Sequence, residues 1–85
     1  MKVSIIIPTY NETRTLPHIL EAVRAASFGF PAEREIIVID DGSSDNTKEI
    51  LADEKDITAI YLPVNQGKGA ALKEGFKHAT GDIVM

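Results

Sequence analysis

Two carboxylates and several turn-forming residues directly follow an apolar run in the segment Val38-Ile39-Asp40-Asp41-Gly42-Ser43-Ser44-Asp45-Asn46-Thr47. An ionised carboxylate at the end of a buried strand is well placed to accept hydrogen bonds from a ligand. Because successive side chains of a strand point to opposite faces, Asp40 and Asp41 cannot both face that ligand. One is expected to face it while the other holds the turn. The alternative is that both only end the strand and cap the next helix, since Asp, Gly, Ser and Asn all favour turns.

A second polar loop, Pro8-Thr9-Tyr10-Asn11-Glu12, follows another apolar run at residues 3–7. Pro8 has no amide hydrogen for a strand ladder and is expected to end strand pairing. Tyr10 could stack on a planar base, and Glu12 could accept hydrogen bonds from vicinal hydroxyls. For Glu12 alone, an acidic residue that suits the dipole of the following helix is the simpler interpretation.

The third polar loop, Asn65-Gln66-Gly67-Lys68-Gly69, places glycines and a lysine at the start of a predicted helix. Free backbone amides and the helix dipole favour phosphate at such a position, so Lys68 is a candidate for binding phosphate or nucleotide. A plain solvated lysine in a tight loop is the alternative. The segment is neither a Walker loop nor a complete dinucleotide fingerprint. His18 and His78 have no metal-ligand partner at helical spacing, and we assign neither to a site.

Short apolar runs predict four strands, at residues 3–7, 35–39, 57–62 and 83–85, with Pro63 ending the third. Three helices are predicted between them from apolar residues at helical spacing. Thr15 is a plausible cap for the first, whose first turn tolerates Pro17, and Asp45 or Ser44 is expected to cap the second, which runs to about Ala52. The apolar faces of the first and third helices comprise Leu16, Ile19, Leu20, Val23 and Ala26, and Leu72, Gly75, Phe76 and Ala79, respectively.

This alternation predicts an α/β protein with a parallel sheet, right-handed crossovers and helices on both faces, a three-layer α/β/α arrangement. If the second and third strands lie on one side of the first strand and the fourth lies on the other, the first strand is at the topological switch point. Ligands of open α/β sheets bind there, outside the carboxyl ends of the strands. The polar loops after residues 7 and 39 lie at those ends, so we expect them to share one ligand.

Composition limits the function classes. With 85 residues the chain forms at most one domain, and a net charge of −4 argues against a polyanion such as nucleic acid as its partner. The absence of cysteine fits a reducing compartment, and no stretch approaches the roughly 20 apolar residues of a membrane span. We therefore expect a cytoplasmic location, with the full-length protein at the cytoplasmic face of a membrane as an alternative.

Four segments resemble, in order and spacing, the nucleotide-binding half of inverting family 2 glycosyltransferases with the GT-A fold. These segments are 8–12, 38–47, 67–72 and 79–82. The likeness covers nearly the whole chain and is closest to polyprenyl-phosphate or dolichyl-phosphate mannose or glucose synthases. It implies a Rossmann-like sheet of the GT-A type, truncated after the start of strand four. Residues 1–85 would then be the incomplete N-terminal nucleotide-sugar-binding part of a glycosyltransferase domain.

The resemblance also implies a donor such as GDP-mannose or UDP-glucose and an acceptor such as polyprenyl phosphate or a saccharide. Asp41 matches the family carboxylate that accepts the base N–H, which suits the N–H edge of uracil or guanine. Asp40 is then expected to brace the loop. The other positions implied to bind nucleotide sugar are Pro8, Tyr10 and Glu12 at the base and ribose, Ile39 lining the base pocket, and Lys68.

The family holds a diphosphate-bound Mg²⁺ or Mn²⁺ with an Asp-x-Asp motif shortly after the fourth strand, and no such motif occurs in these residues. We therefore expect no metal site within this chain, catalytic residues beyond residue 85, membrane contact only through the missing regions, and an isolated segment without transferase activity. A non-catalytic nucleotide-binding or regulatory α/β module is the main alternative. A phosphoacceptor receiver domain would need an aspartate where Leu62-Pro63 ends the third strand.

Overall fold

The computed structural model describes all residues from 1 to 85, and in it strands and helices alternate as the sequence predicts. The order is β1 (Lys2–Thr9), α1 (Leu16–Ala25), β2 (Glu33–Asp41), α2 (Thr47–Ala52), β3 (Ile57–Leu62), α3 (Lys68–His78) and β4 (Ile83–Val84). None of the three helices has both the length and the apolar character needed to cross a bilayer.

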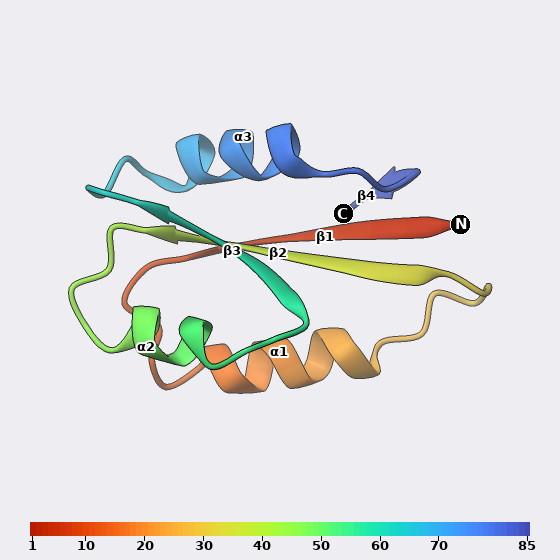
Figure 1. Cartoon of the computed structure of the whole chain (residues 1–85), viewed down its shortest axis with the longest axis horizontal. Helices are drawn as coiled ribbons and strands as arrows, with labels where there is room; N and C mark the ends of the chain where they lie inside the picture. Colours follow the sequence, from red (N-terminus) through yellow and green to blue (C-terminus); the bar gives the residue numbers. More distant parts are fainter.

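All four strands are parallel and follow the order β3-β2-β1-β4. The first strand therefore has neighbours on both sides, which confirms the predicted topology. The carboxyl ends of β1, β2 and β3 lie together with the start of α3 at the left of Figure 1. This end of the sheet is where a parallel α/β protein holds its ligands.

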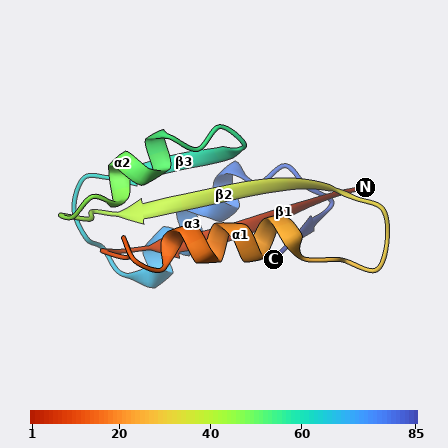
Figure 2. The same cartoon turned by 90° about the horizontal axis from the view of Figure 1, so that it is seen from below.

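Helices cover both faces of the sheet, with α3 on one face and α1 and α2 on the other (Figure 1). Seen from the side of α1 and α2, α2 runs beside β3 and α1 lies over β1 and β2 (Figure 2). Because adjacent residues of a strand face opposite sides, each strand contributes to both cores. The core under α1 and α2 contains Ile7, Leu16, Leu20, Ile36, Val38 and Leu51, and the core under α3 contains Ile6, Ile37, Ile39, Leu62 and Ala71.

The first two strands are longer than predicted, and the expectation that Pro8 ends strand pairing is wrong. Pro8 and Thr9 continue the register with β2, opposite Ile39 and Asp40. The amide of Ile6 donates to the carbonyl of Met85 beside β4. The nitrogen of Pro8, two residues further on, faces the same edge as the Ile6 amide and not β2, so its missing N–H costs no ladder bond with β2.

The first helix starts at the predicted position, whereas the second starts later than a cap at Asp45 or Ser44 implies, and the capping bonds differ from those expected. Thr15 occupies the N-cap position of α1 without a capping bond, and its hydroxyl instead donates to the Glu12 carboxylate at 3.1 Å. Pro17 lies in the first turn, as expected. Asn46 is the N-cap residue of α2, yet the carboxylate of Asp45 accepts the Thr47 amide at 3.0 Å. Asp45 therefore satisfies a free amide at the start of this helix.

The apolar face of α3 is narrower than predicted. Ala71 and Gly75 are buried against the sheet, and Leu72 and Ala79 flank them. The expectation that Phe76 packs on this face is wrong, because its side chain is 56% exposed. One residue of a helix turns the side chain by about 100°, so Phe76 points away from the contact centred on Gly75.

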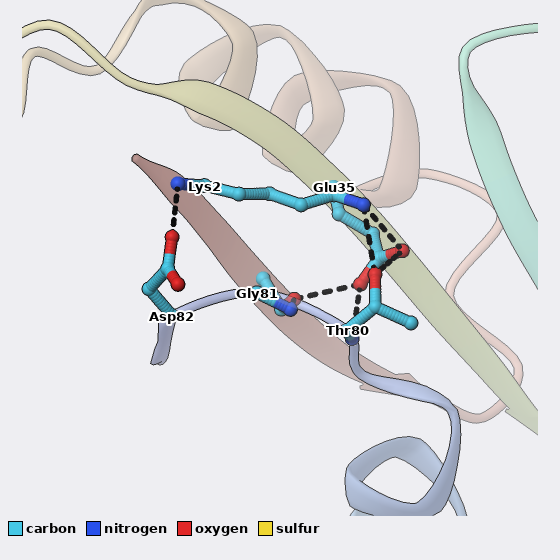
Figure 3. Close-up of polar contacts among 6 residues, drawn as sticks. Lys2, Glu35, Thr80, Gly81 and Asp82 are labelled. Carbon is cyan, nitrogen blue, oxygen red and sulfur yellow. Dashed lines mark hydrogen bonds and ion pairs between the residues drawn. The ribbon is translucent and has the colours of Figure 1, made fainter.

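A polar cluster at the amino ends of β1 and β2 holds the turn before β4 (Figure 3). Glu35 accepts the Ser4 hydroxyl at 2.6 Å and the Thr80 amide at 2.8 Å, and Lys2 donates to the Thr80 hydroxyl at 2.8 Å. The Ser4 hydroxyl in turn accepts the Gly81 amide at 2.8 Å. These bonds fix the register of a two-residue strand that has little apolar burial of its own.

Candidate functional site

A cavity of about 580 Å³ opens at the carboxyl ends of β1 and β2, beside the start of α3. Its wall consists of residues from β1 and the loop after it, of Asp41 at the end of β2, and of residues from the loop before α3 and from α3 itself. The lining residues are Ile6, Pro8, Thr9, Tyr10, Glu12, Asp41, Asn65, Gly67, Lys68 and Leu72. The three polar loops singled out from the sequence therefore meet around one hollow.

Most of the site residues predicted from the sequence line this cavity. Pro8, Tyr10 and Glu12 come from the end of β1 and its loop, and they face Asp41 and Lys68. Tyr10 lines the cavity and is 46% exposed, so its side chain is accessible to a ligand. The structure thus brings together side chains with apolar, aromatic, anionic and cationic character, a combination that suits a ligand with a ring, hydroxyls and negative charge.

Ile39 is the one predicted site residue that does not line the cavity. It is fully buried in the core under α3, next to Gly75. Ile6 and Leu72 take the apolar positions in the cavity instead. Ile6 belongs to the first predicted strand, and Leu72 belongs to the predicted apolar face of the third helix. Their position at the edge of the core depends on how far α3 extends over the sheet. Residue type alone does not reveal that distance.

Asp41 is almost completely buried and binds the loop before α3. Its carboxylate accepts the backbone amides of Gln66 at 2.8 Å and Gly67 at 2.9 Å, and the Asn65 side-chain amide at 3.3 Å. Asn65 also donates to the Asp41 carbonyl at 3.2 Å. The Asp41 side chain is therefore the main polar link between β2 and the loop before α3, a role that residue type did not reveal.

Gly42 allows this loop to approach β2 closely. A Cβ atom on Gly42 would lie 2.5 Å from the Asn65 nitrogen and 2.6 Å from the Val64 carbonyl carbon. Gly42 also has a φ of 75°, which side chains rarely adopt. No other residue type fits this position without moving the cavity wall.

Asp40 lies on the opposite face of β2, as its alternation with Asp41 predicts. It is fully buried, and its Oδ1 atom accepts the Ser43 amide at 3.3 Å. The other oxygen, Oδ2, has no hydrogen-bond partner within the protein, and neither has the hydroxyl of Thr9 in the paired position of β1. The Ser43 contact agrees with the expectation that Asp40 braces the turn.

Hydrogen bonds between two loops hold the segment that carries Tyr10 and Glu12. The Asn11 amide donates to the Ser43 hydroxyl at 2.9 Å, and the Asn11 side-chain oxygen accepts the Ser44 amide at 2.8 Å. Asn11 adopts a left-handed φ of 51°, a conformation that asparagine tolerates better than most residues. The loops after β1 and β2 therefore form one connected unit.

A further bond joins the same loops at Thr13, whose hydroxyl donates to Asp45 at 2.6 Å. Together with the Thr47 hydroxyl and amide, this contact lowers the pKa of the Asp45 carboxyl to about 2. Asp45 therefore remains ionised and bonded throughout the neutral and mildly acidic range. It stabilises the rim of the cavity and does not line it.

The residues of this chain do not fit a divalent metal site. No group of three or more His, Cys, Asp or Glu side chains converges anywhere in the structure. Near the cavity the carboxylate of Asp41 is already bonded to backbone amides. The arrangement can therefore hold the organic part of a ligand, and Lys68 offers one cationic side chain to its negative charge.

Comparison with known proteins agrees with this geometry. The family model described as Glycosyl transferase family 2 matches residues 4–85. The structure is similar to TarS from S. aureus in complex with UDP, with a TM-score of 0.85 and 31% identity over 100% of this chain and 26% of that chain. It is also similar to the mannosyltransferase PcManGT from Pyrobaculum calidifontis in complex with GDP-Man and Mn²⁺, with a TM-score of 0.85 and 30% identity over 98% of this chain and 26% of that chain.

TarS from S. aureus has also been solved in complex with UDP-GlcNAc, and this structure has a TM-score of 0.82 and 28% identity over 100% of this chain and 25% of that chain. The chain thus spans about a quarter of the length of these solved proteins. The similarity covers all three loops that form the cavity.

Proposed function

Because the chain belongs to glycosyl transferase family 2, we propose that its protein transfers a sugar from a nucleotide-diphosphate sugar to an acceptor. The observation that carries this proposal is the single cavity in which Tyr10 and Glu12 face Asp41 and Lys68. Three loops that are far apart in the sequence supply these side chains, and all of them lie at the carboxyl ends of parallel strands. The cavity would bind the nucleotide part of the donor.

Each side chain suits one part of such a donor. The exposed face of Tyr10 can stack on the base, beside the flat ring of Pro8. The carboxylate of Glu12 can accept hydrogen bonds from the ribose hydroxyls. Asp41 would accept the base N–H. A carboxylate has about four acceptor positions, and residues 65–67 occupy three of them, so one remains for the base.

Lys68 is the only cationic side chain among those that line the cavity. It stands at the first position of α3, where free backbone amides and the helix dipole also favour negative charge. Sugar transfer leaves a nucleoside diphosphate, so negative charge develops on the leaving phosphate. Lys68 would stabilise that charge and hold the diphosphate while the acceptor oxygen attacks the anomeric carbon from the opposite face.

We further propose a hexose donor of the GDP-mannose or UDP-glucose type and polyprenyl phosphate as the acceptor. The complexes of PcManGT with GDP-Man and of TarS with UDP-GlcNAc support both bases equally. Mg²⁺ or Mn²⁺ is the proposed cofactor of the whole enzyme, and the Mn²⁺ in the PcManGT complex supports it.

Calorimetric titration of the protein at its natural length with GDP-mannose, UDP-glucose and ADP-glucose, with and without Mn²⁺, tests the proposal. We expect one of the first two to bind and ADP-glucose, whose base lacks an imide or lactam N–H, to bind far more weakly. Addition of polyprenyl phosphate should then release the nucleoside diphosphate. Binding without any release would favour a non-catalytic nucleotide-binding module, and no binding of any donor would refute the proposal.

A further inference from the structure

The carboxylate of Asp41 is largely occupied before any ligand arrives. The side chain is only 3% exposed, and it accepts the amides of Gln66 and Gly67 with different oxygens, at 2.8 and 2.9 Å. The Asn65 side chain takes a third acceptor position. No lysine or arginine pairs with this carboxylate, so these N–H donors alone compensate for its burial. Loss of these bonds would leave the amides or the carboxylate unsatisfied.

The residues that Asp41 holds determine the position of Lys68. Gly67, whose amide is bonded to Asp41, is the N-cap residue of α3, and Lys68 follows it as the first residue of the helix. Gly67 has a φ of 99°, so the chain turns sharply between the Asp41 contact and the lysine. A displacement of the Gly67 amide would therefore change where the Lys68 side chain enters the cavity.

Gly42, the residue after Asp41, also holds this loop in place, through close packing of the backbone. The backbone of Val64 and Asn65 lies so close to Gly42 that a Cβ atom there would be 2.6 and 2.5 Å away from it. The loop thus has polar bonds to residue 41 and close backbone packing on residue 42. Asp41 at the end of β2 and Gly42 in the turn after it therefore hold the loop that precedes Lys68, the only cationic side chain lining the cavity.

We propose that Asp41 is a positioning residue for phosphate binding, whose carboxylate holds the backbone of residues 65–67 so that Lys68 faces the diphosphate. This inference rests on the proposed nucleotide function and deepens it. An aspartate that only accepts the base N–H would affect the nucleoside part of the ligand alone. A positioning aspartate affects the phosphate part, through a lysine that it does not touch.

The ratio of the dissociation constants of nucleoside and nucleoside diphosphate separates the two roles. We call this ratio the diphosphate advantage, and uridine with UDP or guanosine with GDP provides it, according to the base that binds. Asp41→Asn keeps the side-chain shape but turns an N–H₂ donor toward a backbone N–H. We expect D41N and K68M each to lower the diphosphate advantage by about tenfold. The D41N/K68M double variant should lower it no further than K68M alone.

Two further variants make the test independent of the chemistry of Asp41. Gly42→Ala leaves the carboxylate intact but pushes on the Asn65 backbone, and it should also lower the diphosphate advantage. Glu35→Gln is the matched control, because it changes a carboxylate to an amide on the same face of β2 at the far end of the sheet. It should leave the advantage unchanged even where it lowers stability.

The inference is overturned if D41N weakens nucleoside and diphosphate equally, or if the D41N and K68M effects on the advantage multiply in the double variant. If D41N does not fold, G42A decides, and an unchanged advantage in G42A overturns the inference. A wild-type protein that binds neither nucleoside nor diphosphate would instead refute the proposed function itself, and the inference with it. Wild-type binding thus distinguishes the two failures.

Discussion

Gly75 of α3 lies directly over Ile39 of β2, so that a Cβ atom on the glycine would be only 2.7 Å from the Ile39 Cδ1 atom. The Ile6 Cγ2 atom would be closer still, at 2.4 Å. Contacts this short do not occur between packed carbon atoms, so α3 reaches the sheet only because residue 75 has no side chain. The helix therefore covers Ile39 and leaves the hollow to form beyond it, at the strand ends.

Replacing Gly75 by alanine should destabilise the protein by about 1 to 3 kcal/mol, since the added methyl group overpacks the core. The measurement is the free energy of unfolding in urea. Gly69→Ala is the matched control on the same helix, because nothing lies within 4 Å of its added Cβ atom. Alanine at this position should be neutral or stabilising by up to about 1 kcal/mol. Equal losses in the two variants would contradict the account of the helix–sheet contact.

The sequence predicts the order of elements and the sheet topology well, because period and length distinguish the apolar runs of strands from those of helices. It also predicts that Tyr10, Glu12 and Asp41 meet, since parallel strands end at one edge of the sheet. It does not predict how deeply Ile39 is buried. Ile39 lies on the same side of β2 as Asp41, but two residues earlier in the strand, where α3 covers it. That depth depends on the close approach at Gly75.

The partners of Asp41 also escape sequence reasoning. Its residue type and position suggest a carboxylate that faces a ligand, and the structure shows the same carboxylate bonded to backbone amides of the loop at 66–67. Every residue except proline carries such an amide, so no pattern of side chains marks these donors. The prediction that β1 ends at Pro8 is wrong for a related reason. Whether a missing N–H removes a ladder bond depends on which neighbouring strand that position faces, and residue type does not reveal this.

Glu35 should make stability depend on pH in the acidic range. Hydrogen bonds from the Ser4 hydroxyl and then the Thr80 amide lower the pKa of its carboxyl from 4.5 to about 2. Since the folded protein then binds its proton less readily than the unfolded chain, the contribution is complete above pH 4.5 and is lost as the pH falls toward 2.

We therefore expect Glu35→Gln to lower the free energy of unfolding by about 1 to 2 kcal/mol at pH 7. The difference from the wild type should shrink between pH 4.5 and pH 2. Urea unfolding at several pH values measures it. Glu74→Gln is the control, because this residue forms only surface pairs, with Lys77 at 3.2 Å and His78 at 3.8 Å, and its replacement should change stability by less than about 0.5 kcal/mol. A pH-independent difference for E35Q would contradict the assignment.

Asn11→Ala should loosen the unit formed by the loops after β1 and β2. The variant removes the acceptor of the Ser44 amide and places alanine at a left-handed φ of 51°, which together should cost about 1 to 2 kcal/mol. Because Tyr10 and Glu12 flank this residue, nucleotide affinity should fall as well. Asn46→Ala is the control, since the side chain at this N-cap position makes no capping bond. Equal effects of the two variants on affinity would show that the loop bonds do not shape the cavity.

Tyr10 offers the sharpest test of how the base binds, because the chain contains a second tyrosine of nearly equal exposure outside the cavity. Tyr10 is 46% exposed and lines the cavity, whereas Tyr61 on β3 is 43% exposed and does not. Stacking of a base on an aromatic ring is worth about 1 to 3 kcal/mol by alanine substitution. Tyr10→Ala should therefore weaken nucleoside binding by about tenfold or more in calorimetry, while Tyr10→Phe keeps the ring and most of the affinity. Tyr61→Ala removes as much exposed aromatic surface and should leave affinity unchanged. If Y10F loses as much as Y10A, the hydroxyl and not the ring face holds the ligand, and the base lies elsewhere in the cavity.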